Sequence, residues 1–280
     1  MPDDSPALDS DPAAWQASLR LRFADDAGTT RLVGNVHSGP LRVQKPLYPE
    51  GPRICHAIII HPPGGVVGGD GLAIAALAGP ATHVLLSAPG ASKWYRANGK
   101  LSTQQVCIEA GAGAAVEWMP QETIFFNDAR VRLRHEVRLA ADATYIGCEI
   151  LCFGRRASGE RFNAGAIGQR SQIWRGAKLV WWEQGHLRAD GPAMGSVLGL
   201  DGASVCATVV AVGAPVPPAL QASIRALDPA LAVSQLKAVF VARYLGHDSE
   251  QARRLVILVW QALRPHLLGC AAPVPRIWLT

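Results

Sequence analysis

The sequence VRLRHEVRL at residues 131–139 alternates apolar and polar side chains, which is the pattern of a β-strand with one buried face. The apolar positions run from Val131 to Leu139 at every second residue. His135 lies among them, so we expect a core histidine with satisfied hydrogen bonds. The intervening positions hold mostly arginines, namely Arg130, Arg132, Arg134 and Arg138. The segment therefore predicts a strand whose solvent-facing side is basic.

Short apolar or alternating runs continue on both sides of this strand, from Trp15 to about Val212, with turn residues between them. We expect hairpin turns at residues 110–113 (AGAG) and 175–177 (RGA). The runs lie at residues 57–61, 82–87, 104–109, 114–119, 144–153 and 172–184. Regularly spaced strands of this kind predict an all-β sandwich, barrel or solenoid.

After Pro218 the apolar spacing becomes helical. The helical segments are residues 219–227, 232–245 and 248–268. The last has the clearest boundaries, because Asp248 can cap the helix, Gln251 can reach back to its start, and Gly269 can end it. We expect the apolar faces of these helices to pack in the core of the chain in preference to forming an interface with a partner.

The chain is predicted to be one domain over residues 15–280, preceded by a short acidic flexible tail at residues 1–14. Within the domain, a β body covers about residues 15–212 and a helical part covers about 219–268. The tail contains four aspartates and no apolar segment, so it does not resemble a signal peptide.

The composition excludes several classes of protein. At 49% hydrophobic and 18% charged residues the chain is not globally disordered. The net charge is +5, but the basic residues are dispersed, which argues against a nucleic-acid-binding module. The apolar stretches at residues 72–91 and 202–222 are broken by prolines, so no membrane span is expected. The six cysteines include no C-x-x-C pair, which is typical of buried free thiols in a cytoplasmic protein.

The sequence GGVVGGD at residues 64–70 looks like a phosphate-binding loop but has neither the P-loop nor the dinucleotide spacing. We interpret it as a wide turn in which glycines supply unusual backbone angles. The eight histidines show no preformed metal-site spacing, and no nucleophile elbow is present. A metal-dependent hydrolase using His61 and Asp70 is the alternative function, and it would need a third ligand.

Two acidic residues have apolar neighbours and are the most informative. Glu149 lies beside Ile150, and Glu183 follows Trp182. A carboxylate buried in such a strand needs a cation, water or an ionic partner. A salt bridge to an arginine and a functional role both remain open.

Several motifs together resemble the urease accessory proteins of the UreD type, also called UreH. They are GPLRVQKPLYPE at 39–50, HPPGGVVGGD at 61–70, PGASKWYR at 89–96, EWMPQE at 117–122, FGR at 153–155 with Gly159-Glu160, RPH at 264–266 and PRIWL at 275–279. These motifs follow the family order over nearly the whole chain.

The resemblance implies a β-helix-like, or β-solenoid, body with a C-terminal helical layer, and a scaffold instead of an enzyme. Such a scaffold would bind the urease structural subunits on one side and UreF with the GTPase UreG on the other, and homodimerisation within that complex is a further expectation. It would hold no permanent cofactor and would conduct transient nickel(II) to the urease active site. Asp70, Glu149 and Glu183 are the predicted nickel contacts.

The resemblance further assigns partner-binding or structural roles to a set of motif residues: Gly39, Pro40, Gln44, Pro46, Tyr48, Pro49, His61, Pro63, Gly64, Gly65, Gly68, Gly69, Lys93, Tyr95, Arg96, Trp118, Pro120, Gln121, Gly154, Arg155 and Glu160.

Overall fold

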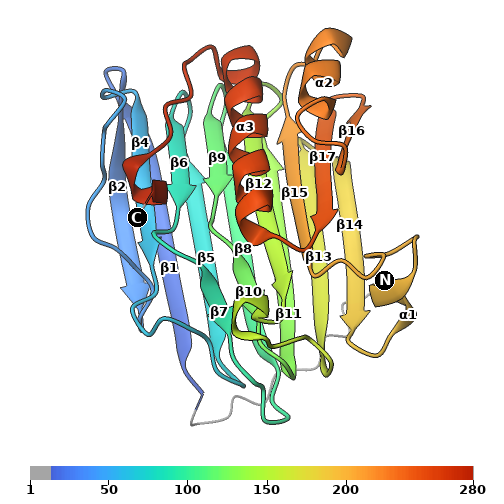
Figure 1. Ribbon diagram of the computed structural model, residues 1–280. Helices are drawn as coiled ribbons and strands as arrows, with labels where there is room; N and C mark the ends of the chain where they lie inside the picture. Colours follow the sequence, from blue (N-terminus) through green and yellow to red (C-terminus); the bar gives the residue numbers. More distant parts are fainter. Residues whose placement is uncertain (1–13, 280) are drawn as a thin grey trace.

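A computed structural model describes residues 14–279, and its strands form two β-sheets that face each other (Figure 1). Between β4 and β13 the chain passes repeatedly from one sheet to the other. Neighbouring strands in this part are therefore parallel within each sheet. This is the β-solenoid that the family resemblance implied. Apart from Ala14, the predicted acidic tail lies outside the described residues.

The first sheet has seven strands and a parallel centre with an antiparallel strand at each edge. In spatial order its strands are β14 (Lys178–Arg188), β13 (Gly165–Arg175), β11 (Ala129–Leu139), β8 (Ser102–Ala110), β5 (Gly71–Ala78), β1 (Gln16–Asp26) and β2 (Thr29–Ser38). The alternation at residues 131–139 is confirmed, because the odd-numbered apolar residues of β11 pack inward and Arg130, Arg132 and Arg138 are exposed. The predicted hairpin at residues 175–177 is also confirmed, between β13 and β14.

The second sheet has ten strands. Its main path is β16 (Leu231–Leu236), β17 (Val239–Gly246), β15 (Val205–Val212), β12 (Thr144–Phe153), β9 (Ala115–Met119), β6 (His83–Ser87), β4 (Ile54–Ile60) and β3 (Arg42–Val43). Two short strands, β7 (Ser92–Trp94) and β10 (Thr123–Phe125), pair with each other, and β10 also pairs with β12. The inward rows of both sheets form the main hydrophobic core.

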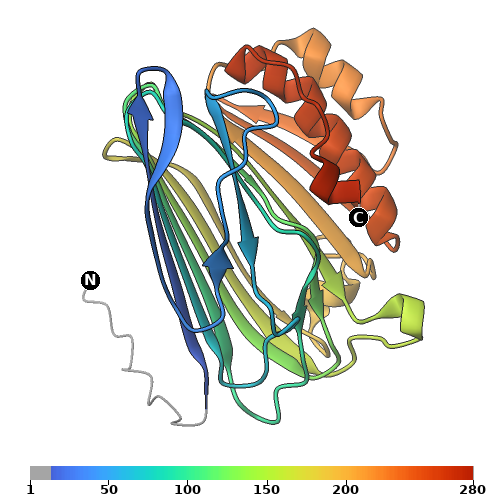
Figure 2. The ribbon, with the colours of Figure 1, turned by 90° about the vertical axis from the view of Figure 1, so that its left-hand side faces the viewer.

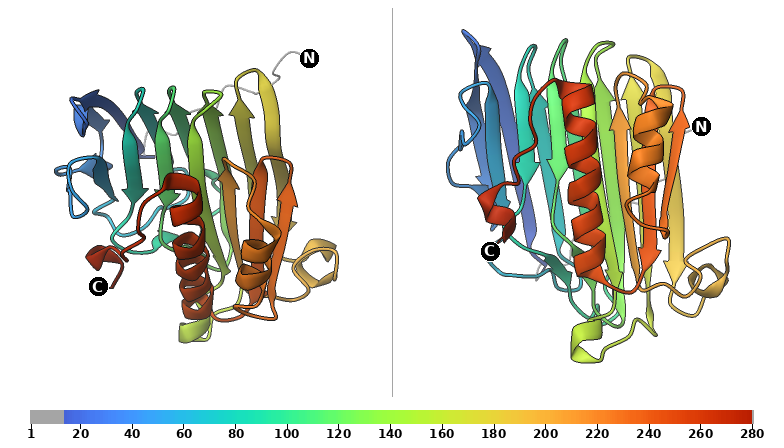
Figure 3. Two further views of the ribbon diagram at one scale, coloured as in Figure 1. Left: turned by 90° about the horizontal axis from the view of Figure 1, so that it is seen from above. Right: turned by 45° about the horizontal axis from the view of Figure 1, so that its top comes forward.

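Within residues 14–279, the two longer helices cover the outer face of the ten-stranded sheet (Figures 2 and 3). They are α2 (Pro218–Arg225) and α3 (Ser249–Leu268), and the 3-10 turn Arg276–Leu279 packs against α3 in the same layer. The short helix α1 (Pro192–Gly195) and the 3-10 turn Arg156–Ser158 lie elsewhere. The inner face of α3 packs on β12, β15 and β17 in a second core layer. None of the helices described is long and apolar enough to cross a membrane.

The predicted helix at residues 248–268 is confirmed together with its end signals. Asp248 accepts hydrogen bonds from the backbone N–H groups of Glu250 and Gln251, and Gly269 takes a left-handed conformation at the C-terminal end. The side chain of Gln251 does not reach back to the cap; it donates instead to Asp228 at 2.7 Å. The inner side of α3 is buried, as expected for a core helix.

Two predictions of local structure are wrong. Residues 232–245 form no helix but the antiparallel strands β16 and β17, which turn at Lys237 with a φ of +56°. Pairing of β17 with β15 outweighs the helical preference of this segment. Residues 110–113 form no hairpin either, because β8 before them and β9 after them belong to different sheets. This turn is a corner of the solenoid.

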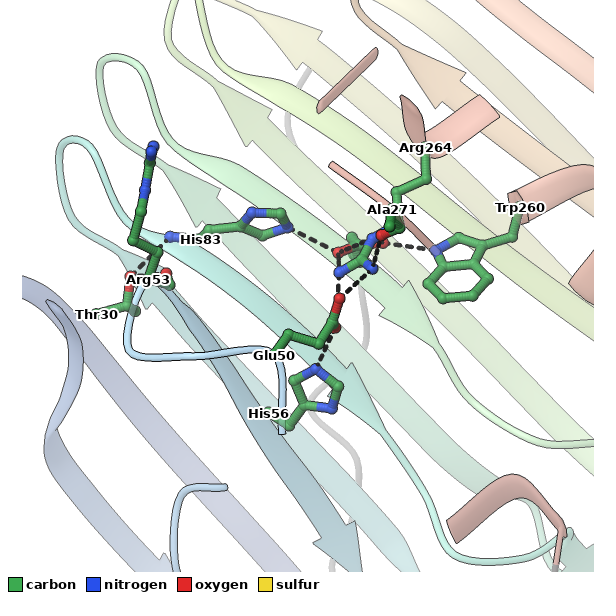
Figure 4. Close-up of polar contacts among 9 residues, drawn as sticks. Thr30, Glu50, Arg53, His56, His83, Trp260, Arg264 and Ala271 are labelled. Carbon is green, nitrogen blue, oxygen red and sulfur yellow. Dashed lines mark hydrogen bonds and ion pairs between the residues drawn. The ribbon is translucent and has the colours of Figure 1, made fainter. Parts of the chain in front are cut away.

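A buried ionic cluster holds the end of α3 against the second sheet (Figure 4). The guanidinium of Arg264 is fully buried and donates to Glu117 at 3.1 Å and to Glu50 at 2.6 Å and 2.9 Å. Glu117 also accepts from Trp260 at 2.5 Å. Two histidines complete the cluster: His83 lies 2.7 Å from Glu117, and His56 lies 2.8 Å from Glu50.

The electrostatics of this cluster favour the ionised carboxylates. Burial by itself opposes ionisation of Glu117, but the hydrogen bond from His83 and the charge of Arg264 outweigh it and lower its pKa. Burial likewise opposes ionisation of Glu50, yet the hydrogen bonds from His56 and Arg264 bring its pKa down to about 2. The cluster joins the loop before β4, strands β6 and β9, and helix α3 through charge-assisted hydrogen bonds.

Candidate functional site

A cavity of about 290 Å³ lies between the two sheets. It is lined from the seven-stranded sheet by Ile74, Val106, His135, Gln169, Ser171 and Glu183, and from the ten-stranded sheet by Ile59, Ser87, Trp118, Tyr145, Glu149 and Thr208. Inward positions of the strands are apolar elsewhere in the core. Because several inward positions here are polar, the cavity can hydrogen-bond water or a polar ligand.

Glu149 is the cavity carboxylate whose pKa is raised. Its carboxylate accepts a hydrogen bond from the Gln169 amide at 2.5 Å, across the space between β12 and β13. Burial and the nearby charge of Glu183 raise the pKa of Glu149 to about 7, although the amide of Gln169 and Arg243 act in the opposite direction. Glu149 therefore gains or loses a proton close to neutral pH.

Glu183, in contrast, has an arginine partner. The guanidinium of Arg243 lies 2.5 Å from its carboxylate and also donates to the Thr208 hydroxyl at 3.1 Å. Of the two interpretations left open by the sequence, the salt bridge fits Glu183. Glu149 has only a neutral amide as its direct partner, so its charge is uncompensated by any contacting cation among the described residues.

Two further groups near the carboxylates are held neutral. His135 lies 2.9 Å from the Tyr145 hydroxyl, and burial lowers its pKa to about 4. This confirms the predicted core histidine. Cys206, on β15, lies close enough to Glu149 and Glu183 to respond to their charges, and burial is the main reason that its pKa rises to about 11.

Three motifs that are distant in sequence meet at the cavity. Its lining includes His61, Gly64 and Gly65, the segment 87–93, and Trp118, Pro120 and Gln121. The strand pair β7–β10 and a bridge between Val66 and Trp94 fix these segments side by side.

The glycines of the 64–70 loop allow close packing at this place. A Cβ on Gly65 would lie 2.3 Å from the ring of Tyr95, and one on Gly68 would lie 2.0 Å from the carbonyl oxygen of Ala97. Gly64 and Gly69 have positive φ angles of 75° and 99°. The interpretation as a wide structural turn agrees with this geometry.

Asp70 lies apart from the other two predicted nickel contacts. One of its carboxylate oxygens accepts from the backbone N–H of Trp15 at 2.9 Å, and the other accepts from that of Val67 at 3.1 Å. It is 7% exposed and does not line the cavity. The structure therefore brings Glu149 and Glu183 together but gives Asp70 contacts typical of a turn.

The hydrolase alternative gains no third ligand. Within residues 14–279, no group of three or more histidine, cysteine, aspartate or glutamate side chains is arranged to hold a metal ion. His61 does face the cavity, and burial lowers its pKa against the opposing effect of Asp70.

The remaining motif residues surround the solenoid at several places. Arg155 pairs with Glu160 at 2.8 Å and lies over the Phe126 ring at 4.2 Å, and Tyr95 meets the same ring edge-on. Tyr48 donates to the backbone of Thr30 at 2.9 Å. The exposed members are Gly39, Gln44, Pro49, Pro63, Gly64, Lys93, Arg96 and Arg155. The half-buried members are Pro40, Pro46, Tyr48, His61, Gly68, Gly69, Tyr95, Pro120 and Glu160, and the buried ones are Gly65, Trp118, Gln121 and Gly154.

Sequence reasoning missed the partners of the cavity carboxylates and the centre of the ionic cluster. Gln169 and Arg243 follow Glu149 and Glu183 by 20 and 60 residues and carry no local signal. Arg264 could have been found, because it falls on the apolar face of an amphipathic helix, where a charged residue requires a buried partner.

Comparison with known proteins identifies the family to which the chain belongs. Residues 16–279 match the family described as UreD urease accessory protein. The chain is 58% identical to the urease accessory protein UreD of Janthinobacterium sp. (strain Marseille), over 95% of this chain and 92% of the relative. It is 48% identical to that of Nitrosospira multiformis and 45% identical to that of Dechloromonas aromatica, over 95% of this chain in both cases and 98% and 95% of the relatives. With a family match from β1 to the C-terminal turn on a β-solenoid of this design, the chain belongs to the UreD urease accessory protein family.

Proposed function

We propose that this protein acts in urease maturation as a cytoplasmic scaffold, which joins urease apoprotein to the UreF–UreG complex and conducts nickel(II) to the urease active site. The observation that carries the proposal is the family match over residues 16–279. Relatives that match at up to 58% identity bear the name urease accessory protein. The family match and the names of these relatives support an accessory role over a catalytic one.

The cavity supports the conducting part of the proposal. It offers a divalent cation the carboxylate oxygens of Glu149 and Glu183 from opposite sheets, between polar walls. A pKa of about 7 lets Glu149 exchange a proton for a cation near neutral pH without a large free-energy cost. Oxygen ligands that are few in number bind such an ion only briefly, which suits passage more than storage. Nickel is cargo in this scheme.

The test is nickel loading in a host that expresses the urease subunits and the other accessory genes at fixed nickel. We compare no chain, wild type, Glu149→Ala, Glu183→Ala and the double variant. Glu109→Ala is the matched control, because Glu109 is an exposed glutamate on β8. Nickel per purified urease is measured by mass spectrometry, and complex formation by co-purification.

We expect wild type and Glu109→Ala to load urease equally and the carboxylate variants to load less while complexes still form. Equal nickel content of urease with and without the chain would contradict the accessory function itself. Unchanged nickel content in both single variants and in the double variant would contradict only the conducting role of the carboxylates.

A further inference from the structure

In the part of the chain that the structure describes, the outer face of the seven-stranded sheet carries no helix, in contrast to the helix-covered face of the ten-stranded sheet (Figure 2). Which side chains lie on this bare face follows from strand alternation. His135 and Gln169 point inward, because they bond to Tyr145 and Glu149. Their neighbours Arg134 and Arg170 therefore point outward.

The strand register places basic and aromatic side chains close together on this face. Arg134 lies directly opposite Arg170 in the β11–β13 pair. One step along β11, Arg132 lies opposite Gly168, which in turn pairs with His186 of β14. One step the other way, Glu136, which is paired with Arg138, lies opposite Gln172, and Gln172 pairs with Trp182. We call Arg132, Arg134, Arg170, Trp182 and His186 the arginine patch.

The charge of the arginine patch is not neutralised within the part of the chain that the structure describes. Two other arginines of this sheet have partners: Arg138 lies 2.6 Å from Glu136, and Arg188 lies 3.0 Å from Asp190. No ion pair forms at Arg132, Arg134 or Arg170 within residues 14–279. Like charges directly opposite in a sheet are destabilising, so the pairing of Arg134 with Arg170 costs free energy in the isolated chain. An anionic partner would remove this cost.

The composition of the patch is that of a protein-binding site. Arginine and tryptophan are the residues enriched at the energetic centres of interfaces, and Trp182 is 50% exposed. Guanidinium groups on rigid strands favour carboxylates, with which they form two parallel hydrogen bonds. Basic residues on the chain as a whole are dispersed, which disfavours a nucleic acid as the occupant.

We propose that the arginine patch is a docking surface for a carboxylate-rich surface of a partner protein. The inference deepens the proposed function and rests on it, because the candidate partners are the proteins of urease maturation. The patch lies on the side of the body opposite α2 and α3, so a protein bound there leaves the helical layer free (Figure 2).

The experiment measures dissociation constants of purified wild type and variants for two probes, apo-urease and the UreF–UreG complex. The patch variant is Arg134→Glu with Arg170→Glu. The matched control is Arg20→Glu with Arg22→Glu, exposed residues of β1 on the same face of the same sheet. Both variants change the net charge equally, so a general electrostatic effect would weaken both alike.

We expect the patch variant to bind one of the two probes about 10-fold or more weakly, and the control to change binding less than about 2-fold. Arg134→Glu alone provides a check on folding. It places a carboxylate opposite Arg170, so its melting temperature should be no lower than that of wild type, while binding is still lost.

Equal weakening by patch and control variants, or no weakening of either probe, would overturn the proposal while leaving the accessory function intact. A wild-type chain that binds neither probe would overturn both. Arginine-dependent binding of duplex DNA, or of a synthetic peptide of residues 1–14 by a chain starting at residue 14, would replace the partner protein with another occupant and refute the proposal as stated.

Discussion

Replacing Glu149 with glutamine should make the stability of this protein less dependent on pH. The pKa of Glu149 rises from its ordinary value of 4.5 to about 7, chiefly because of burial. Below about pH 4.5 the carboxyl is protonated in both the folded and the unfolded chain. Between that pH and about 7 the unfolded chain ionises while the folded chain keeps its proton, so the free energy of unfolding falls as pH rises.

The magnitude follows from the shift. At 1.36 kcal/mol per pKa unit, the wild type loses about 3 kcal/mol across this range because of Glu149, and the partial exposure of this side chain to solvent lowers the expected value to about 1–3 kcal/mol. A glutamine at this position cannot ionise, so the variant does not lose this stability as pH rises. The variant should therefore gain stability relative to wild type as pH increases from about 5 to about 8.

The assay is urea denaturation of wild type, Glu149→Gln and the exposed control Glu109→Gln at both pH values. The control should follow wild type. If the difference in free energy of unfolding between Glu149→Gln and wild type were the same at both pH values, the pKa of Glu149 would not be raised as the structure indicates.

Three further predictions concern stability and use denaturation or melting as the measurement. Arg264→Met should cost about 3–5 kcal/mol, because it leaves Glu117 buried and ionised without its main counter-charge; a loss under about 1 kcal/mol would show that the cluster is not as dry as described. Gly68→Ala should cost about 1–3 kcal/mol through overpacking, whereas Gly90→Ala, which has nothing within 4 Å of its added Cβ, should change melting little; equal melting of the two variants would contradict this packing. Asp248→Ala should cost about 1 kcal/mol by removing the cap of α3, and an unchanged free energy of unfolding would mean that the cap is redundant.

Where nearby residues decide the local structure, that structure can be predicted from the sequence. The cap at Asp248 and the left-handed Gly269 set the ends of α3, and the alternation in β11 set its buried face. Where long-range pairing decides the structure, it cannot be predicted in this way. Lys237 makes a turn with a positive φ in a residue type that gives no turn signal, so the sequence predicts a helix where the structure has the hairpin of β16 and β17.

The same limit applies to the site. The apolar neighbours of Glu149 and Glu183 are enough to single out these two carboxylates, which are half-buried and line the cavity. The sequence held no information on which of them has the arginine, because Arg243 comes from a strand 60 residues away. Asp70 carried the same motif signal as the others, yet its oxygens are taken by the backbone of its own turn and of Trp15.

The thiol of Cys206 has a consequence for chemical selectivity. A thiolate beside two carboxylates would make this region attractive to soft ions such as copper(I), which sulfur holds tightly. With a pKa of about 11 the sulfur stays protonated at neutral pH and is a poor ligand. At neutral pH the region therefore presents carboxylate oxygens beside a protonated thiol.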